Sequence, residues 1–319
     1  MLDSSLHDLL AQVASMYYEQ DLTQNDIATQ LGLSRVKVYR LLKQAKAEGI
    51  VEITINWLIE RDPSLEKDLC QTFGLKDALV LKTLTPNRSA ALPALGQLAA
   101  NYLERILTDN STLAVCLGRS TYEAIHAISP GFQAKVRVAQ AMGSMPFSMQ
   151  DIDSATLARH LAQKLGGEVL YLSSPLMADS VEAAEVLRSQ RHIKQVLMAA
   201  RVADVALLGI GNLDPNYSGL LKAGFITPAE LAELANGGAV GDVAGQIFDL
   251  NGECHHCEYN QRVIGVTLAE LKHIPITLAI AMGLPKAKAI LGGLRTGAIN
   301  VLCTDDTAAR EVLSLNENF

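Results

Sequence analysis

Aromatic residues, cysteines and long apolar runs are all scarce in this 319-residue chain. Aromatic residues make up 5% of it, with a single Trp, and five cysteines at irregular spacing argue against the disulfide framework of a small secreted domain. No apolar run approaches the ~20 residues that cross a bilayer. The N-terminal stretch MLDSSLHDLL lacks the basic flank and the cleavage site of a signal peptide. We therefore expect a cytoplasmic protein with no membrane partner.

Charged residues make up 19% of the chain and apolar residues 49%, which is usual for a soluble globular α/β protein. The chain is long enough for two domains, one of which can form a large hydrophobic core. The formal net charge is −7, yet residues 35–46 contain five cations and no acidic residue. This local reversal of sign indicates a surface for an anionic partner.

Residues 22–56 have the pattern of a helix-turn-helix followed by a short strand. Thr23 can cap a helix, and Asp26 three residues later completes a capping-box-like pair. Gly32 can take the left-handed conformation that ends this helix, and Ser34 can cap the next one. The inward-facing residues predicted for this unit are Ile27, Ala28, Leu31, Val38, Leu41, Leu42 and Ala45. Such a unit places one helix in the major groove of DNA.

The second helix carries the predicted DNA contacts. Residues near the N-terminus of such a helix reach base edges, so we assign readout to Arg35, Lys37 and Tyr39, and phosphate contacts to Arg40 and Lys43. The alternative is the solvated face of an ordinary helical hairpin, but two caps, a glycine turn and clustered cations together favour DNA binding. The full predicted set is Thr23, Gln24, Ser34, Arg35, Lys37, Tyr39, Arg40 and Lys43.

A change of periodicity marks the end of the small domain. Apolar residues at helical spacing predict a first helix over residues 5–20, and alternation over residues 50–55 predicts a strand that acts as a wing or closing edge. Asp62-Pro63 marks a break before a further helix. We divide the chain into a helix-turn-helix domain (1–56), a linker (57–63) and an effector-binding and oligomerisation domain (64–319).

The larger domain alternates apolar strand-like runs with helical stretches, which predicts an α/β fold with a doubly wound, Rossmann-like parallel sheet covered on both faces. The predicted strands are 78–84, 112–117, 136–141, 168–172, 204–210, 274–281 and 299–303. The predicted helices include 95–107, 156–165, 190–201, 228–235 and 286–295. In such sheets ligands bind outside the carboxyl ends of the strands, which narrows the search to the loops there.

Three loops are candidates for a ligand site. Gly118, followed by Arg119, Ser120 and Thr121 at a helix start, offers backbone N–H groups and hydroxyls suited to a phosphate, although Ser and Thr also cap helices for structural reasons. Asp242 is expected in a loop, where its carboxylate suits vicinal hydroxyls, or alternatively closes a turn. Lys286 opens a helix and could meet a phosphate or a sugar hydroxyl. We expect Cys303-Thr304-Asp305-Asp306 to be structural.

The run Cys254-His255-His256-Cys257 consists of residue types that bind zinc. On a strand, successive side chains alternate faces, so four adjacent residues cannot surround one ion tetrahedrally. No second Cys/His pair lies elsewhere at zinc-site spacing. We therefore predict no metal and no other cofactor.

The chain resembles the SorC family of bacterial sugar-responsive transcription regulators over nearly its whole length. The segments that carry the resemblance are YYEQDLTQNDIATQLGLSRVKVYRLLKQAKAEGIVEI, DVALLGIGNL, AVGDVAGQIFDLNGE and RVIGVTLAELKHIPITLAIAMGLPKAKAILGGLRTGAINVLCTDDTAAREVL. The resemblance implies a winged helix-turn-helix joined to a domain similar to sugar-phosphate isomerases and deaminases. It also implies a tetramer that binds operator DNA and responds to a phosphorylated sugar.

The resemblance further implies the residues of the effector site. The effector phosphate would lie at the loop of Gly118, Arg119, Ser120 and Thr121, and the sugar hydroxyls would meet Asp242 and Lys286. Gly143 stands where relatives often carry a glycine pair. The full implied set is Gly118, Arg119, Ser120, Thr121, Gly143, Asp242 and Lys286.

Two functions compete. The first is a DNA-binding regulator of a carbohydrate-utilisation operon, controlled by a phosphorylated sugar. The alternative is a sugar-phosphate isomerase or deaminase with an appended DNA-binding domain, which needs a positioned acid/base pair. None of the candidate histidines, His126, His160, His192, His255, His256 and His273, lies in the three loops. We therefore predict no catalytic residue, and a constitutive DNA-packaging protein fails to explain the large second domain.

Overall fold

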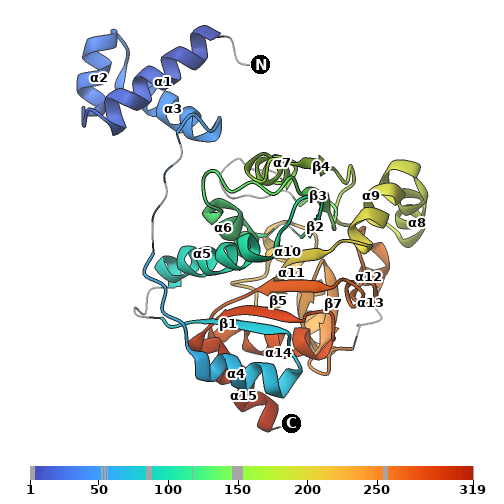
Figure 1. The fold of residues 1–319 in the computed structure, drawn as a ribbon. Coiled ribbons are helices and arrows are strands. Elements are labelled where there is room, and N and C mark those ends of the chain that lie inside the picture. The colour runs from blue at the N-terminus through green and yellow to red at the C-terminus, as the bar shows by residue number, and fades with distance from the viewer. Residues whose placement is uncertain are drawn as a thin grey trace. The chain divides into compact units, whose positions relative to one another are not determined.

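The computed structural model describes residues 4–51, 53, 55, 57–83, 88–116, 118–145, 154–253 and 258–318. The chain divides into two compact units, Met1–Asn56 and Trp57–Phe319 (Figure 1). No helix in these described ranges is both long and apolar enough to span a bilayer. Each unit has its own core and is described separately.

The first unit contains three helices, α1 (Ser4–Tyr18), α2 (Gln24–Leu31) and α3 (Arg35–Ala47). Leu10 and Val13 of α1 are buried together with the predicted inward-facing residues of α2 and α3, except that Leu31 is only partly buried against this cluster. Thr23 and Asp26 form a reciprocal capping box, and Gly32 adopts φ 65° at the end of α2. The Ser34 hydroxyl accepts a hydrogen bond from the Lys37 N–H at 3.2 Å. The predicted caps and glycine turn are therefore confirmed.

The predicted wing strand, residues 50–55, falls partly on residues 52 and 54, which lie outside the described ones. Among the described residues of this stretch, Val51, Ile53 and Ile55 belong to no strand. Ile53 and Ile55 are 54% and 59% exposed. Among the described residues, no strand pairs with this stretch, and an unpaired strand is not stable alone.

The second unit is built on a sheet in the order β1-β9-β8-β5-β2-β3-β4, whose strands all run parallel. Their bounds are β1 (Asp77–Leu81), β2 (Thr112–Val115), β3 (Arg137–Gln140), β4 (Glu168–Leu170), β5 (Val205–Asn212), β8 (Ile276–Ile280) and β9 (Val301–Asp305). The predicted parallel α/β architecture is confirmed. Because every strand runs the same way, the carboxyl ends meet at one edge of the sheet.

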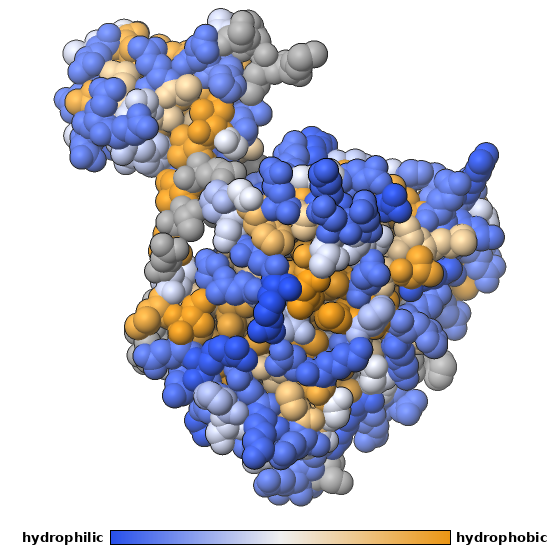
Figure 2. Space-filling model, viewed as in Figure 1, coloured by the Kyte–Doolittle hydropathy of each residue, from blue (hydrophilic) through white to orange (hydrophobic). Residues whose placement is uncertain are grey.

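Helices cover both faces of this sheet (Figure 1). The helices are α4 (Pro63–Phe73), α5 (Arg88–Ile106), α6 (Arg119–Ala127), α7 (Ser154–Lys164), α8 (Val181–Ser189), α9 (Arg191–Arg201), α10 (Gly219–Lys222), α11 (Pro228–Asn236), α12 (Glu258–Arg262), α13 (Leu268–Leu271), the 3-10 turn η1 (Leu284–Lys286), α14 (Ala287–Arg295) and α15 (Asp306–Glu317). Residues of α5, α6 and α7 form one core cluster, and residues of α4, α9, α14 and α15 contribute to the other. Figure 2 shows apolar side chains gathered in the middle of the visible face of this unit, ringed by hydrophilic ones.

An antiparallel hairpin, β6 (Ala239–Val243) and β7 (Gln246–Asp249), extends from the end of β5. Its turn, Ala244 and Gly245, has φ 54° and 78°. The prediction that Asp242 lies in a loop is therefore wrong, because Asp242 pairs with Gly211 of β5 inside strand β6. The hairpin fixes the direction of this carboxylate more firmly than a loop would.

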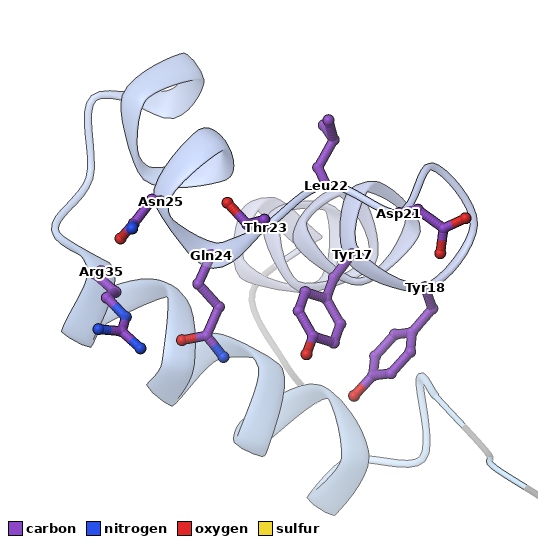
Figure 3. Close-up of a pocket in the computed structure, with 8 residues that line it drawn as sticks. All are labelled: Tyr17, Tyr18, Asp21, Leu22, Thr23, Gln24, Asn25 and Arg35. Carbon is purple, nitrogen blue, oxygen red and sulfur yellow. The ribbon is translucent and has the colours of Figure 1, made fainter.

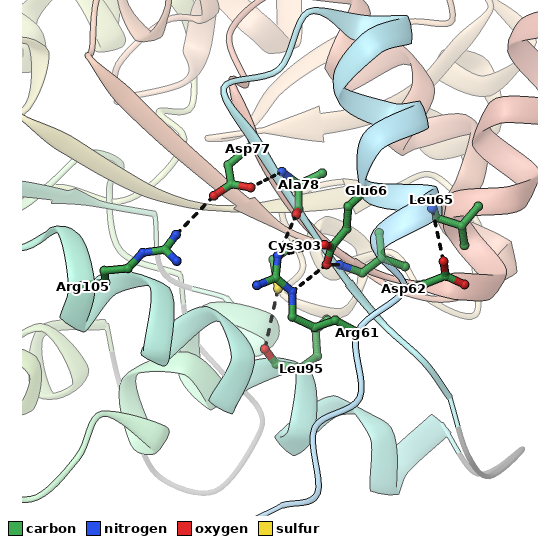
Figure 4. A network of polar contacts seen from close by, with 10 residues as sticks. Arg61, Asp62, Leu65, Glu66, Asp77, Ala78, Leu95, Arg105 and Cys303 are labelled. Carbon is green, nitrogen blue, oxygen red and sulfur yellow. Dashed lines mark hydrogen bonds and ion pairs between the residues drawn. The ribbon is translucent and has the colours of Figure 1, made fainter.

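The first residues of the second unit are fastened to the end of β1 (Figure 4). The Asp62 N–H donates to the Val80 carbonyl at 2.9 Å, so this stretch runs alongside the strand. The Arg61 guanidinium holds both carboxylate oxygens of Glu66, at 2.7 and 2.9 Å. Glu66 Oε1 also accepts the Val80 N–H at 2.9 Å. This bidentate pair ties the chain that leaves the first unit to an edge strand of the sheet.

Candidate functional site

The exposed face of α3 carries the predicted cations. Arg35, Lys37, Arg40, Lys43 and Lys46 are all exposed, while the opposite face of the helix is buried. The ammonium of Lys46 lies 5.5 Å from the ring centroid of Tyr18, a cation–π distance. α3 therefore presents a positive surface along its length, as contact with a phosphate backbone requires.

The first turns of α3 also expose apolar surface, since Tyr39 is 56% and Val36 59% exposed. Tyr39 was predicted from the sequence, whereas Val36 was not. A branched apolar side chain that remains exposed between two cations can contact the methyl group of a thymine in the major groove. Its position in the first turn of α3, between Arg35 and Lys37, was the signal that could have identified it.

A pocket in the first unit lies among the end of α1, the start of α2 and the start of α3 (Figure 3). Its lining is Tyr17, Tyr18, Asp21, Leu22, Thr23, Gln24, Asn25 and Arg35. Three of these, Thr23, Gln24 and Arg35, belong to the predicted DNA-binding set. The Thr23 hydroxyl lies 2.6 Å from a carboxylate oxygen of Asp26, so its role is to cap α2. The polar groups of Gln24, Asn25 and Arg35 are suited to a phosphate of the DNA backbone.

In the second unit, the loop after β2 leads into α6, and Gly118 is the N-cap residue of this helix. The Gly118 N–H donates to Thr121 Oγ1 at 2.8 Å. The Thr121 hydroxyl faces the carbonyls of Cys116 and Gly118 at 3.2 and 2.9 Å. Thr121 is fully buried, so it shapes the loop from within, whereas Arg119 is exposed and Ser120 is partly exposed.

Asp242 and Lys286 come together beside the end of β5. Burial raises the pKa of the Asp242 carboxyl from 3.8 to about 6, although Lys286 and the Gly245 N–H act in the opposite direction. The Lys286 ammonium donates to the carbonyl of Ile210. Burial also raises the pKa of the Cys116 thiol, and the Asp242 charge adds to this effect. Because the Asp242 carboxyl interacts electrostatically with Cys116 and with Lys286, it lies close to the end of β2 and to the turn that follows β8.

Gly143 has a different environment from the other predicted effector residues. Its N–H donates to the Ile264 carbonyl at 2.8 Å, and it is buried. A Cβ at this position would lie 2.1 Å from the Pro175 carbonyl oxygen. The structure therefore shows Gly143 packed between two backbone segments, where only a glycine fits.

Gln140, at the end of β3, was missed by the sequence analysis. Its side chain is 1% exposed, and Oε1 accepts the Leu172 N–H at 2.8 Å. Within the described part of the chain, Nε2 has no hydrogen-bond partner. A polar residue that ends the apolar run of residues 136–141 was the available signal.

The described histidines lie away from this constellation. His126 lies in the last turn of α6, the end opposite to Gly118, and its ring centroid is 5.3 Å from that of His160. Burial, with smaller contributions from His160 and Lys164, lowers the pKa of His126 to about 4. His192 Nε2 lies 3.1 Å from the Tyr171 carbonyl oxygen. Asp242 therefore has no imidazole beside it among the residues that the structure describes.

The run Cys254-His255-His256-Cys257 lies outside the described residues. Elsewhere, among the described residues, no group of three or more His, Cys, Asp or Glu side chains could hold a metal ion. The binding groups that the structure brings together are thus backbone N–H groups, a carboxylate and an ammonium.

Comparison with known families gives two matches. Residues 59–314 match the family described as "Putative sugar-binding domain". Residues 5–66 match the Crp-like helix-turn-helix domain. The two matches together span nearly the whole chain, and the first covers the sheet with all of its loops.

Relatives of known role match along their full length. The chain is 37% identical over 313 residues to the transcriptional regulator LsrR of Klebsiella pneumoniae, covering 97% of this chain and 93% of the relative. It is 28% identical over 313 residues to the deoxyribonucleoside regulator of Bacillus subtilis, covering 98% and 99%. Among solved structures, the full-length sorbitol operon regulator SorC of Klebsiella pneumoniae superposes with a TM-score of 0.72 at 28% identity, covering 98% of this chain and 100% of that one.

Proposed function

The chain belongs to the SorC family of sugar-binding transcriptional regulators, and on this basis we propose that a phosphorylated sugar binds at the carboxyl ends of β2, β5 and β8 and changes the affinity of the chain for operator DNA. It is a DNA-binding, sugar-responsive transcriptional regulator. We further propose that it acts in the cytoplasm on a carbohydrate-utilisation operon. The observation that carries the proposal is the meeting of the α6 N-terminus, Asp242 and Lys286 at one edge of the sheet.

The proposed effector site combines two kinds of recognition. The first turn of α6 offers backbone N–H groups and the positive end of the helix dipole, and Arg119 and Ser120 stand on that turn, so the phosphate is assigned there. Asp242, ionised above pH ~6, accepts hydrogen bonds from vicinal hydroxyls. Lys286 is held against Ile210 and balances the carboxylate charge. Thr121 and Gly143 support this site through packing and do not contact the ligand.

The proposed DNA contact uses α3. Arg35, Lys37 and Tyr39 face base edges, and Arg40 and Lys43 contact phosphates. Gln24, at the start of α2, and Ser34, at the cap of α3, lie where helix-turn-helix proteins approach the backbone. Operator binding as a homotetramer is part of the same proposal, and light scattering of the purified protein tests it. The effector changes DNA affinity only to the extent that it binds one arrangement of the subunits more tightly than another.

The enzymatic alternative receives less support. An isomerase or deaminase needs an acid/base pair that reaches the sugar carbons, and the described surroundings of Asp242 supply an ammonium and backbone groups. His126 and His160 contact each other at the far end of α6. The relatives named above are transcriptional regulators.

A thermal-shift screen of the purified protein tests the effector proposal. The compounds are sorbitol 6-phosphate, fructose 6-phosphate, ribose 5-phosphate and 2-deoxyribose 5-phosphate, each beside its unphosphorylated parent. Binding to the native state raises the melting temperature in proportion to RT ln(1 + [L]/Kd). We expect a phosphorylated compound to stabilise the wild-type protein and Lys288→Ala equally, and Asp242→Ala to lose the shift. A shift of equal size from the unphosphorylated parent contradicts the phosphate assignment.

A further inference from the structure

The last part of β5 has glycine at positions 209 and 211, two residues apart. Side chains in a strand alternate between faces, so both glycines belong to the face that carries Val205 and Leu207. This is the face covered by α5, α6 and α7, because Val205 and Leu207 belong to the core cluster of those helices. Two successive positions on this face therefore carry no side chain.

The two positions differ in what lies over them. A Cβ at Gly211 would lie 1.9 Å from Oδ1 of Asp242, so the Asp242 carboxylate already occupies that space. A Cβ at Gly209 would have no described atom within 4 Å. Among the described residues, no side chain covers the strand backbone at Gly209, directly beside the position that the carboxylate covers.

Gly209 differs from its neighbours on this face, which are covered by described side chains. Two residues earlier, Leu207 is fully buried, and Ile280, the β8 partner of Gly209, is fully buried as well. Gly209 itself is partly exposed. The hydrophobic packing of this face therefore stops at Gly209, and glycine inside a strand often marks a place where a ligand approaches the backbone closely.

The position of this space relates it to the effector groups. α6 packs against β5 on the same face, and its first turn carries the proposed phosphate site. Asp242 borders the space on the side of Gly211. A ligand with its phosphate on α6 and its hydroxyls on Asp242 must cross β5 between the two groups.

We propose that the effector packs directly on the backbone at Gly209, and that the carbon chain of a phosphorylated polyhydroxy compound lies flat on β5 there. This inference rests on the effector proposal above and adds the residue that sets the permitted bulk of the ligand. The hydroxyl substituents of such a chain are small enough to pack against bare strand backbone. A side chain at position 209 would occupy the same space and exclude the ligand.

The chain allows a clean test, because a methyl group at Gly209 meets no described atom and the φ of Gly209 lies outside the left-handed region. Gly209→Ala is therefore compatible with the unliganded fold, and the melting temperature of Gly209→Val shows whether the larger side chain is accommodated as well. A methyl group at Gly219, at the exposed start of α10, would likewise have no described atom within 4 Å, so Gly219→Ala serves as the matched control.

The experiment measures Kd by calorimetry for the sugar phosphate that most stabilises the wild-type protein, together with the melting temperature and the DNA affinity of each variant. We expect Gly219→Ala to match the wild type, Gly209→Ala to bind roughly tenfold more weakly, and Gly209→Val to show no binding. All variants should keep the unliganded melting temperature and the DNA affinity. Wild-type affinity in Gly209→Val overturns the inference. If no sugar phosphate binds the wild type, the effector proposal itself has failed, and the inference falls with it.

Discussion

Replacement of Asp242 by Asn should stabilise the free protein at pH 8 and at the same time abolish its response to the effector. The carboxyl is desolvated beside Gly211, which raises its pKa from 3.8 to about 6 even with Lys286 nearby. Asn has nearly the same shape but carries no charge to desolvate. A residue kept only for stability would show the opposite effect, so the two readouts separate function from folding.

The size of the stabilisation expected for Asp242→Asn follows from the pKa shift of Asp242. The difference between 3.8 and about 6 corresponds to ~3 kcal/mol of preference for the neutral form in the folded state. Because the folded pKa lies above the unfolded value, this cost is absent below pH ~4, develops as the pH rises to about 6, and is complete above it. In a unit of this size, ~3 kcal/mol amounts to roughly 5–10 °C in melting temperature.

The assay is thermal unfolding of wild type, Asp242→Asn and the control Asp68→Asn at pH 5 and pH 8, without ligand. Asp68 lies exposed on α4, and its replacement should leave the melting temperature unchanged at both pH values. Asp242→Asn should melt higher than wild type at pH 8, and about half of that gain should disappear at pH 5. A lower melting temperature at pH 8, or a gain that does not depend on pH, would refute the reasoning.

Three further predictions concern α3 and the loop before α6. Arg40→Ala should reduce the slope of log affinity against log salt by about one, for operator and random DNA alike, whereas Lys67→Ala on α4 should leave it unchanged; an unaltered slope in Arg40→Ala excludes a phosphate contact. Tyr39→Ala should weaken operator binding while sparing random duplex, as competition anisotropy will show; equal losses on both duplexes would remove Tyr39 from base readout. Thr121→Val should cost about 1–2 kcal/mol in urea unfolding, because the partly buried Gly118 N–H loses its acceptor; unchanged stability would contradict the structural role of this hydroxyl.

The helix-turn-helix could be predicted because its signals are local. The Thr23–Asp26 capping box and the positive φ of Gly32 depend on residues within one or two turns of each other. The parallel sheet could be predicted for a similar reason, since strands buried on both faces have continuous apolar sequences. The wing could not be established in this way, because a strand also needs a partner, and Ile53 and Ile55 remain exposed.

The hairpin that carries Asp242 was missed because its turn has no strong sequence signal. Two-residue hairpin turns favour Asn-Gly or Asp-Gly, whereas Ala244 adopts φ 54° here. The roles of Gly143 and Thr121 could not be predicted either, since both depend on what packs against them from distant segments. The space at Gly209 depends on which described side chains of the neighbouring elements reach this position. A sequence shows the glycine but not the space above it.

We expect a sugar phosphate bound in the second unit to change the DNA affinity of the cationic recognition helix α3. The direct measurement is fluorescence anisotropy of a labelled duplex from the region upstream of the gene for this protein, against a scrambled duplex, with and without the sugar phosphate found in the thermal-shift screen. The account predicts tighter binding to the upstream duplex and a Kd that the sugar phosphate changes by at least ~5-fold. Equal affinity for both duplexes, unaffected by the sugar phosphate, would contradict it.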